Sequence, residues 1–133
     1  MKGNKGYSFL GVLLSFMAVA VLLVALPGLR GPAATRRLLI VARDMAFVMP
    51  EADPDHRNPT LRLTAGERVK VIFRNDDPGM RHDLVLDGLG VRTRVLTYGQ
   101  SQSLTFTVLP TTGGQTYLCS RHPRFMRGRW VID

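Results

Sequence analysis

The chain has 133 residues, a net charge of +8 and a single cysteine. This length allows one small domain besides the N-terminal segment, and one cysteine excludes an internal disulfide. The basic charge favours acidic partners, but no interleaving of aromatic and basic residues supports nucleic acid as a partner.

The first element is an apolar segment that follows a basic N-terminus. Residues 1–8 contain lysines and no acid, and residues 9–26 carry no charge. A stretch of this length is just long enough to cross a membrane, and the preceding lysines favour a cytoplasmic N-terminus. We therefore predict a transmembrane signal-anchor over 9–26 and a tether over 27–37, with the following domain on the extracytoplasmic side. The alternative is a signal peptide that is cleaved near Ala33-Ala34 to release a secreted protein.

Short strands separated by turn signals occupy the rest of the chain. Apolar and polar residues alternate with the period of a half-buried strand at 68–74 and again at 101–109. Further strand-like segments are 38–42 (extended after a bend by 45–49), 61–64, 82–86, 116–119 and 128–132, whereas 91–96 is either a strand or an irregular crossing segment. No helical period appears after residue 26. The sequence therefore predicts an all-β domain over 38–133, an antiparallel Greek-key β-sandwich or barrel of about seven to eight strands.

One loop near the C-terminus carries three possible metal ligands. The chain has the spacing Cys-x2-His-x3-Met at Cys119, His122 and Met126. Two histidines and one cysteine in a trigonal set, with a weak axial methionine, form the blue-copper electron-transfer site. The second histidine is expected to be His82, which lies in a turn-rich loop that opens into an apolar strand. These residues predict a mononuclear copper protein.

Each of these residues also has a simpler explanation when it is taken alone. Cys119 fits a buried inert thiol, His82 a histidine bonded to backbone at the core edge, His122 a surface loop residue, and Met126 a hydrophobic plug. The tight spacing and the β context favour the copper site over this set of coincidences.

Other residues compete for the axial position or lie elsewhere. Met80 and the carbonyl group of Arg81 are alternative axial donors because they immediately precede His82. His56 has acidic neighbours in a proline-rich loop and is expected on the surface.

The two ligand segments resemble the cupredoxin family, the group that includes plastocyanin, amicyanin and pseudoazurin. The resemblance covers roughly 38–133 and implies one copper ion held by His82, Cys119, His122 and Met126. It also implies an electron carrier rather than an enzyme. The family commonly has Asn after the first ligand histidine, where this chain has Asp83.

The residues around the ligands are expected to tune the site. The family resemblance implies that Asp83 hydrogen-bonds across to the cysteine loop near Ser120; the alternative is a solvated acid at a strand start. An acid in place of the usual amide would add negative charge near the thiolate and lower the reduction potential. Pro123 stiffens the loop because proline fixes its own φ.

Arginines cluster in or beside the two ligand segments, namely Arg81, Arg121, Arg124, Arg127 and Arg129. We expect Arg81, Arg121, Arg124 and Arg127 to form a docking face for an acidic redox protein such as a cytochrome or an oxidase. The alternative is a generally arginine-rich surface without a docking role. We expect a monomer.

These observations predict a membrane-tethered, type-1 copper protein that passes single electrons between extracytoplasmic redox partners. A single cysteine argues against the dinuclear copper centre of oxidase subunit II, and a single ligand set argues against a multicopper oxidase. The main alternative is a copper carrier or metallochaperone that uses the same ligands. A third possibility is a metal-free structural domain displayed on the membrane.

Overall fold

The computed structural model describes residues 34–110 and 115–133, and every regular element within these ranges is a β-strand. The membrane helix predicted over 9–26 lies outside the described residues. Within them, no helix is long and apolar enough to cross a membrane.

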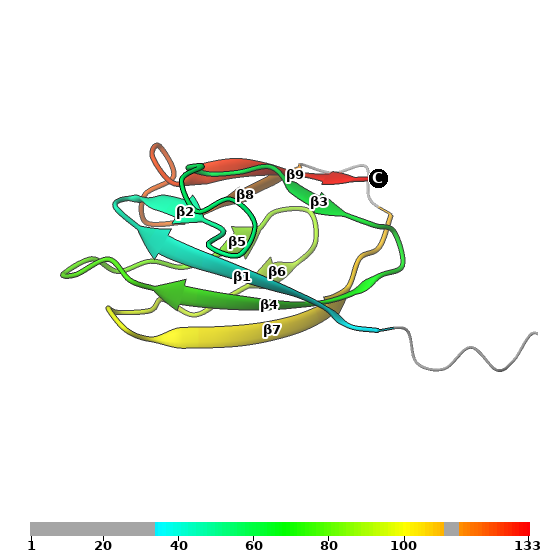
Figure 1. Ribbon diagram of the computed structural model, residues 1–133, viewed down its shortest axis with the longest axis horizontal. Helices are drawn as coiled ribbons and strands as arrows, with labels where there is room; N and C mark the ends of the chain where they lie inside the picture. Colours follow the sequence, from blue (N-terminus) through cyan, green and yellow to red (C-terminus); the bar gives the residue numbers. More distant parts are fainter. Residues whose placement is uncertain (1–33, 111–114) are drawn as a thin grey trace, which may run out of the picture. The chain divides into compact units, whose positions relative to one another are not determined.

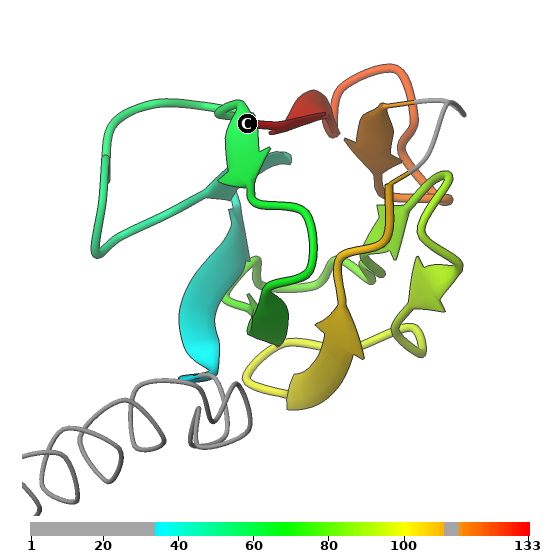
Figure 2. The ribbon, with the colours of Figure 1, turned by 90° about the vertical axis from the view of Figure 1, so that its right-hand side faces the viewer.

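The described chain folds as two β-sheets, as the strand pattern predicted (Figure 1). One sheet has the strand order β2-β1-β4-β7, and the other has the order β3-β9-β8-β5-β6. The strands are β1 (Arg36–Arg43), β2 (Ala46–Val48), β3 (Leu61–Leu63), β4 (Arg68–Asn75), β5 (Val85–Leu86), β6 (Val91–Arg92), β7 (Ser101–Thr107), β8 (Thr116–Leu118) and β9 (Arg127–Ile132). Seen along the strands in Figure 2, the two sheets face each other.

The strand directions are mixed, whereas the sequence predicted an antiparallel domain. β1 runs parallel to β4, with Leu38 opposite Val71, and β3 runs parallel to β9. Parallel neighbours need a crossover between them, and here the chain visits the second sheet at β3 between β1 and β4. Alternation along a strand reports which residues face the core, but it does not report the direction of the neighbouring strand.

The first strands also differ in their bounds from the prediction. β1 begins at Arg36, so the last two residues of the predicted tether belong to the sheet. The expected extension over 45–49 is a separate strand, β2, which folds back on β1. Asp44 and Met45 form the turn, with φ values of 50° and 59°. Two-residue hairpin turns with positive φ at both positions usually contain Asn-Gly or Asp-Gly, and methionine in the glycine position hid this turn.

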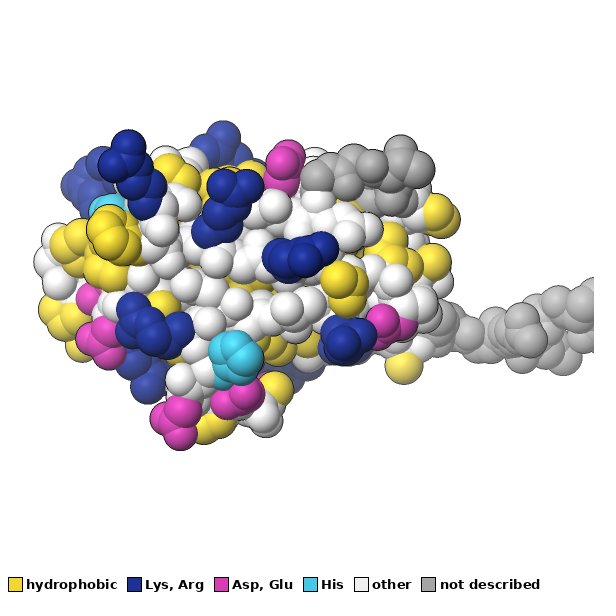
Figure 3. All heavy atoms as spheres, turned by 90° about the horizontal axis from the view of Figure 1, so that it is seen from above, with side chains coloured by type: hydrophobic (Ala, Val, Ile, Leu, Met, Phe, Trp, Pro, Cys, Tyr) yellow, Lys and Arg dark blue, Asp and Glu magenta, His cyan; other side chains and the backbone are white. Residues whose placement is uncertain are grey.

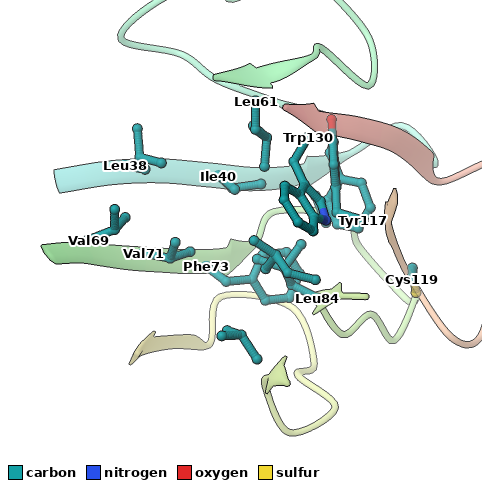
Figure 4. Packing of buried hydrophobic residues seen from close by; sticks show 14 of the residues in the cluster. Leu38, Ile40, Leu61, Val69, Val71, Phe73, Leu84, Tyr117, Cys119 and Trp130 are labelled. Carbon is teal, nitrogen blue, oxygen red and sulfur yellow. The ribbon is translucent and has the colours of Figure 1, made fainter. Parts of the chain in front are cut away.

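Large aromatic side chains fill the space between the sheets. Phe47 contacts Phe73 and Tyr117, with ring centroids 6.0 and 5.3 Å apart. The Tyr117 hydroxyl donates a hydrogen bond to the Pro59 carbonyl, so this buried polar group has a partner. Figure 4 shows the buried cluster that includes Phe73 and Tyr117, with Cys119 at one end of the side chains drawn. The predicted ligands Cys119 and Met126 therefore belong to the buried cluster itself.

Candidate metal centre

Three predicted ligands meet at one end of the core. The Sγ atom of Cys119 lies 3.7 Å from Nδ1 of His82 and 3.8 Å from Nδ1 of His122, and the two Nδ1 atoms are 3.2 Å apart. Among the described residues, this is the group of histidine, cysteine and acidic side chains arranged closely enough to hold a metal ion. Two segments that lie far apart in the sequence thus converge on one point.

The dimensions of this triangle fit a metal ion at its centre. With nitrogen ligands at about 2.0–2.1 Å and a sulfur ligand at about 2.3 Å, the lengths known for zinc, a trigonal site separates N and N by about 3.6 Å and N and S by about 3.8 Å. The two measured N–S separations agree with these values, and the N–N separation is slightly shorter. A thiolate with two imidazoles is also the donor set that suits copper.

The backbone of His82 is fixed by an isolated β-bridge to Leu96, outside the named strands. His82 and Leu96 exchange two backbone hydrogen bonds of 3.1 and 2.7 Å. The strand predicted over 82–86 is shorter, because β5 comprises Val85–Leu86 alone. Just before it, Leu84 donates its N–H to the Thr93 hydroxyl, and this side chain replaces a ladder partner. The His82 side chain is fully buried.

An acidic residue that the sequence analysis did not single out contacts His82. The Nε2 atom of His82 lies 3.0 Å from Oδ2 of Asp77, and both residues are buried. A hydrogen bond from Nε2–H to the carboxylate leaves the Nδ1 lone pair for a metal, as in the carboxylate–histidine pairs of zinc sites. The turn signal at 75–79 marked this loop, but it could not show that Asp77 points inward.

The C-terminal ligand loop is closed by its own backbone. Cys119 donates its N–H to the Met126 carbonyl over 3.0 Å. Inside the loop, the His122 carbonyl accepts hydrogen bonds from the N–H groups of Phe125 (3.1 Å) and Met126 (2.9 Å). Met126 is fully buried at the end of the loop. Its role as the axial ligand remains a prediction.

Asp83 connects the two ligand segments from the other side of the site. Ser120 donates its N–H to Oδ1 and its hydroxyl to Oδ2 of Asp83, both over 2.7 Å. Arg92 lies 3.3 Å from Oδ2, so the buried carboxylate also has a cationic partner at the surface. These contacts have the geometry that the family resemblance implied for Asp83 and Ser120.

Cys119 and His122 both have shifted pKa values in the absence of metal. Burial raises the pKa of the Cys119 thiol above its ordinary value, although backbone hydrogen bonds act in the opposite direction. Burial and the neighbouring His82 and Arg121 lower the pKa of His122. At neutral pH the metal-free site therefore holds a thiol and an uncharged His122, and metal binding must release the thiol proton.

The remaining predicted residues lie at the surface, whereas His122 is half-buried. Pro123, Phe125 and the arginines Arg81, Arg121, Arg124, Arg127 and Arg129 are all exposed. Figure 3 shows cationic side chains beside hydrophobic ones near its left-hand end, the end that carries the orange ligand loop in Figure 1. His56 lies apart from this group, exposed and paired with Asp53.

Comparisons with known proteins give matches in structure alone. No protein-family model matches the sequence, and no curated protein matches it. An auracyanin from Roseiflexus castenholzii has a TM-score of 0.57 and 19% identity, over 77% of this chain and 99% of the auracyanin. Auracyanin A, a "blue" copper protein from Chloroflexus aurantiacus, has a TM-score of 0.55 and 16% identity, over 75% of this chain and all of the other.

An enzyme has a similar region as well. The Cu-containing nitrite reductase of Thermus scotoductus SA-01 has a TM-score of 0.57 and 20% identity, over 75% of this chain but 28% of the enzyme. The protein therefore has the cupredoxin fold, with a cluster of the buried His82 and Cys119 and the half-buried His122, and a buried methionine, at one end. The structural relatives include both a blue copper protein and a copper-containing reductase.

Proposed function

We propose that the chain is a mononuclear type-1 copper protein that carries single electrons and has no catalytic activity of its own. The observation that carries this proposal is the triangle of donor atoms from His82, Cys119 and His122. The same donors would suit a copper carrier, but the closed loop and the buried His82 favour a site that keeps its ion.

The protein's contribution would be to hold the ligands in one geometry. Bound copper supplies the Cu(II)/Cu(I) couple, and these two states prefer different geometries. Rapid electron transfer therefore requires ligands that barely move, which a rigid scaffold provides. Here His82 is pinned to Leu96, and the cysteine loop is closed by the bond between Cys119 and Met126. The half-buried His122 offers the route to a partner.

The central test is the visible spectrum of the copper-loaded soluble domain. We expect an intense charge-transfer band, which Cys119→Ser should abolish because a hydroxyl is a hard and poorly acidic ligand. His82→Ala should weaken copper binding, whereas His56→Ala, the matched control outside the cluster, should leave both band and affinity unchanged.

The outcomes separate the proposal from its alternatives. A mutant Cys119→Ser that keeps the band would refute the site. Tight Cu(I) binding by the unmodified domain without any visible band would favour the copper carrier. If the domain binds no copper after reconstitution, the remaining explanation is a metal-free structural domain.

We also propose that the domain is tethered to a membrane and exposed outside the cytoplasm. The support is the uncharged segment 9–26 after lysines, which lies outside the described residues. The full chain should then stay with the membrane fraction after a high-salt wash. A soluble protein whose N-terminus lies near Ala34 would instead show that the segment is a cleaved signal.

The proposed partner is an acidic redox protein that docks beside His122. Arg81, Arg121, Arg124 and Arg127 are exposed, and none of the ion pairs formed by the described residues uses them. Their charge is thus free to attract a partner of opposite sign, in a one-to-one complex with the monomer.

A further inference from the structure

A buried carboxylate holds the buried ligand histidine from behind. Oδ2 of Asp77 lies 3.0 Å from Nε2 of His82 and accepts a second hydrogen bond of 3.0 Å from the backbone N–H of Met45. Asp77 is 8% exposed and His82 is 0% exposed, so water does not compete strongly for these contacts. The second ligand histidine, His122, is half-buried.

We propose that Asp77 is a positioning residue, which fixes the Nε2–H tautomer of His82 and favours the higher charge state of an ion bound at Nδ1. The inference deepens the proposed function, and its copper measurements rest on that function. The tautomer of His82 is a property of the metal-free chain, so its measurement does not rest on the proposed function.

The surrounding backbone orients the Asp77 carboxylate. Met45 adopts a left-handed conformation with φ of 59°, which is uncommon for a residue other than glycine. This conformation closes the turn between β1 and β2, and the Met45 N–H of that turn points at Asp77. From the other side, Asp77 donates its own N–H to the side chain of Asn75 over 2.9 Å.

Asn75 extends this support to the segment that pins His82. Its side-chain amide donates to the carbonyl groups of Met80 (3.0 Å) and Leu96 (2.9 Å). Leu96 is the residue that exchanges backbone hydrogen bonds with His82. Asp77 and the backbone of His82 are therefore held by one network, which sets the imidazole angle as well as its tautomer.

The charge of Asp77 has a separate consequence from its hydrogen bond. A buried negative charge near the metal stabilises a dication more than a monocation, because Coulomb attraction scales with the ion's charge. Asp83, on the cysteine side, is a second buried acid, but Arg92 and Ser120 compensate it. Among the residues that the structure describes, no lysine or arginine pairs with the Asp77 carboxylate, whose partners are His82 and the N–H of Met45.

Two substitutions separate the bond from the charge. Asp77→Asn keeps an amide oxygen that can accept from both His82 and Met45, but it removes the charge. Asp77→Ala removes both. The matched control is Asp76→Asn, which removes the same charge one residue away, from a carboxylate that is paired with Arg74 at 2.6 Å.

Nitrogen NMR of the metal-free domain tests the tautomer. We expect the proton on Nε2 of His82 in the unmodified protein, in Asp77→Asn and in Asp76→Asn, and a mixture of tautomers in Asp77→Ala. Copper affinity should fall about 10–100-fold in Asp77→Ala, the usual effect of losing an outer partner of a ligand histidine.

Voltammetry of the copper-loaded domain tests the charge. Asp77→Asn should lower the ratio of Cu(II) to Cu(I) affinity about tenfold, which raises a one-electron potential by about 59 mV. Asp76→Asn should shift it much less. Equal shifts in the two Asn variants, or an unchanged His82 tautomer in Asp77→Ala, would overturn the inference. If the unmodified domain binds no copper, the proposed function fails while the NMR comparison still decides the role of Asp77.

Discussion

Asp83 is a buried acid whose stability contribution depends on pH. Burial alone would raise its pKa, but hydrogen bonds from Ser120, Cys119 and Arg92 hold the pKa below the ordinary value of 3.8. A carboxyl group with a lowered folded-state pKa stabilises the protein fully above its unfolded value. This contribution is lost as the pH falls through the lowered folded value.

We therefore expect metal-free Asp83→Asn to be less stable at neutral pH, by about 1 kcal/mol. Its stability should decline less steeply than that of the unmodified protein once the pH drops below 3.8. Urea unfolding over a pH series measures both effects. Asp55→Asn, which changes an exposed acid, is the control and should follow the unmodified protein. Parallel curves for all three proteins would contradict the prediction.

Met126 provides a second test at this scale. Met126→Leu conserves volume in the core and removes the thioether, so the fold should survive. The visible band should persist because Cys119 supplies it, and the reduction potential should rise because a three-coordinate site suits Cu(I) better. Met80→Leu is the matched comparison at the rival donor. A potential that responds to Met80→Leu but not to Met126→Leu would transfer the axial role to Met80.

The sequence was informative about individual residues where the pattern is local. Cys119, His122 and Met126 lie in one short loop, and their spacing alone indicated a metal site. Asp76 and Asp77 are chemically identical neighbours in a turn. The fold directs Asp76 to Arg74 and Asp77 to His82, and no local signal distinguishes them.

At the level of single strands, β8 and β9 pack closely against each other at one glycine. Tyr117 lies opposite Gly128 in the antiparallel register. A Cβ atom at Gly128 would overlap the Tyr117 ring, which cannot retreat because its hydroxyl is bonded to Pro59. Gly128→Ala should cost about 1–3 kcal/mol of unfolding free energy, the usual penalty for overpacking.

Thermal and urea unfolding of Gly128→Ala measure this cost. Arg129→Ala, at the next and exposed position of β9, should change the unfolding free energy by less than about 0.5 kcal/mol. An effect of Gly128→Ala as small as that of Arg129→Ala would show that β8 and β9 separate easily. The close register between them would then not position the cysteine loop.

Strand prediction succeeded for strands that bury one face. It failed for features that depend on which strands pair and in which direction. The alternation in β4 and β7 predicted their inward faces, and the structure shows it directly. A bend after residue 42 was predicted, but the full reversal at Asp44 and Met45 was not, because methionine occupies the turn position that usually holds glycine. The parallel pairing of β1 with β4 likewise follows from the crossover between them, and the residue pattern of neither strand indicates it.

For the molecule as a whole, the proposed docking face predicts a strong dependence on salt. The Debye length falls from about 30 Å at 0.01 M to about 10 Å at 0.1 M, and charges at the rim of an interface mainly change the association rate. Arg121→Glu with Arg124→Glu should therefore slow bimolecular electron transfer with an acidic cytochrome at low salt, without altering the copper spectrum. Stopped-flow kinetics over a salt series measures the effect.

The control for this prediction reverses the same number of charges at the opposite end of the strands. Arg37 in β1 and Arg68 in β4 are exposed, and the chain reaches the ligand segments from the other ends of these strands. Arg37→Glu with Arg68→Glu should slow the reaction much less. Equal slowing by the two pairs would mean that total charge alone matters, and the docking face would be wrong.

The architecture of the domain could be predicted from the sequence, whereas its cellular location and its partners could not. An all-β domain with a copper site was predicted, because turn-separated alternation and a dense ligand spacing are both readable in a single chain. The tether, the partner and the location of the domain depend on a membrane and on other proteins, so they stay predictions.

The distance along the chain between the two ligand segments has a mechanical consequence. His82 and Cys119 are 37 positions apart, and the lone cysteine prevents the chain from closing this span with a disulfide. Under the proposed function, the bound ion would instead form a reversible cross-link between these two segments at one end of the two sheets. Ligands that bind the folded state alone raise its stability in proportion to the logarithm of their concentration. Loading with metal should thus raise the melting temperature, and a chelator in the surrounding compartment would turn an electron carrier into a weaker fold that proteases can open.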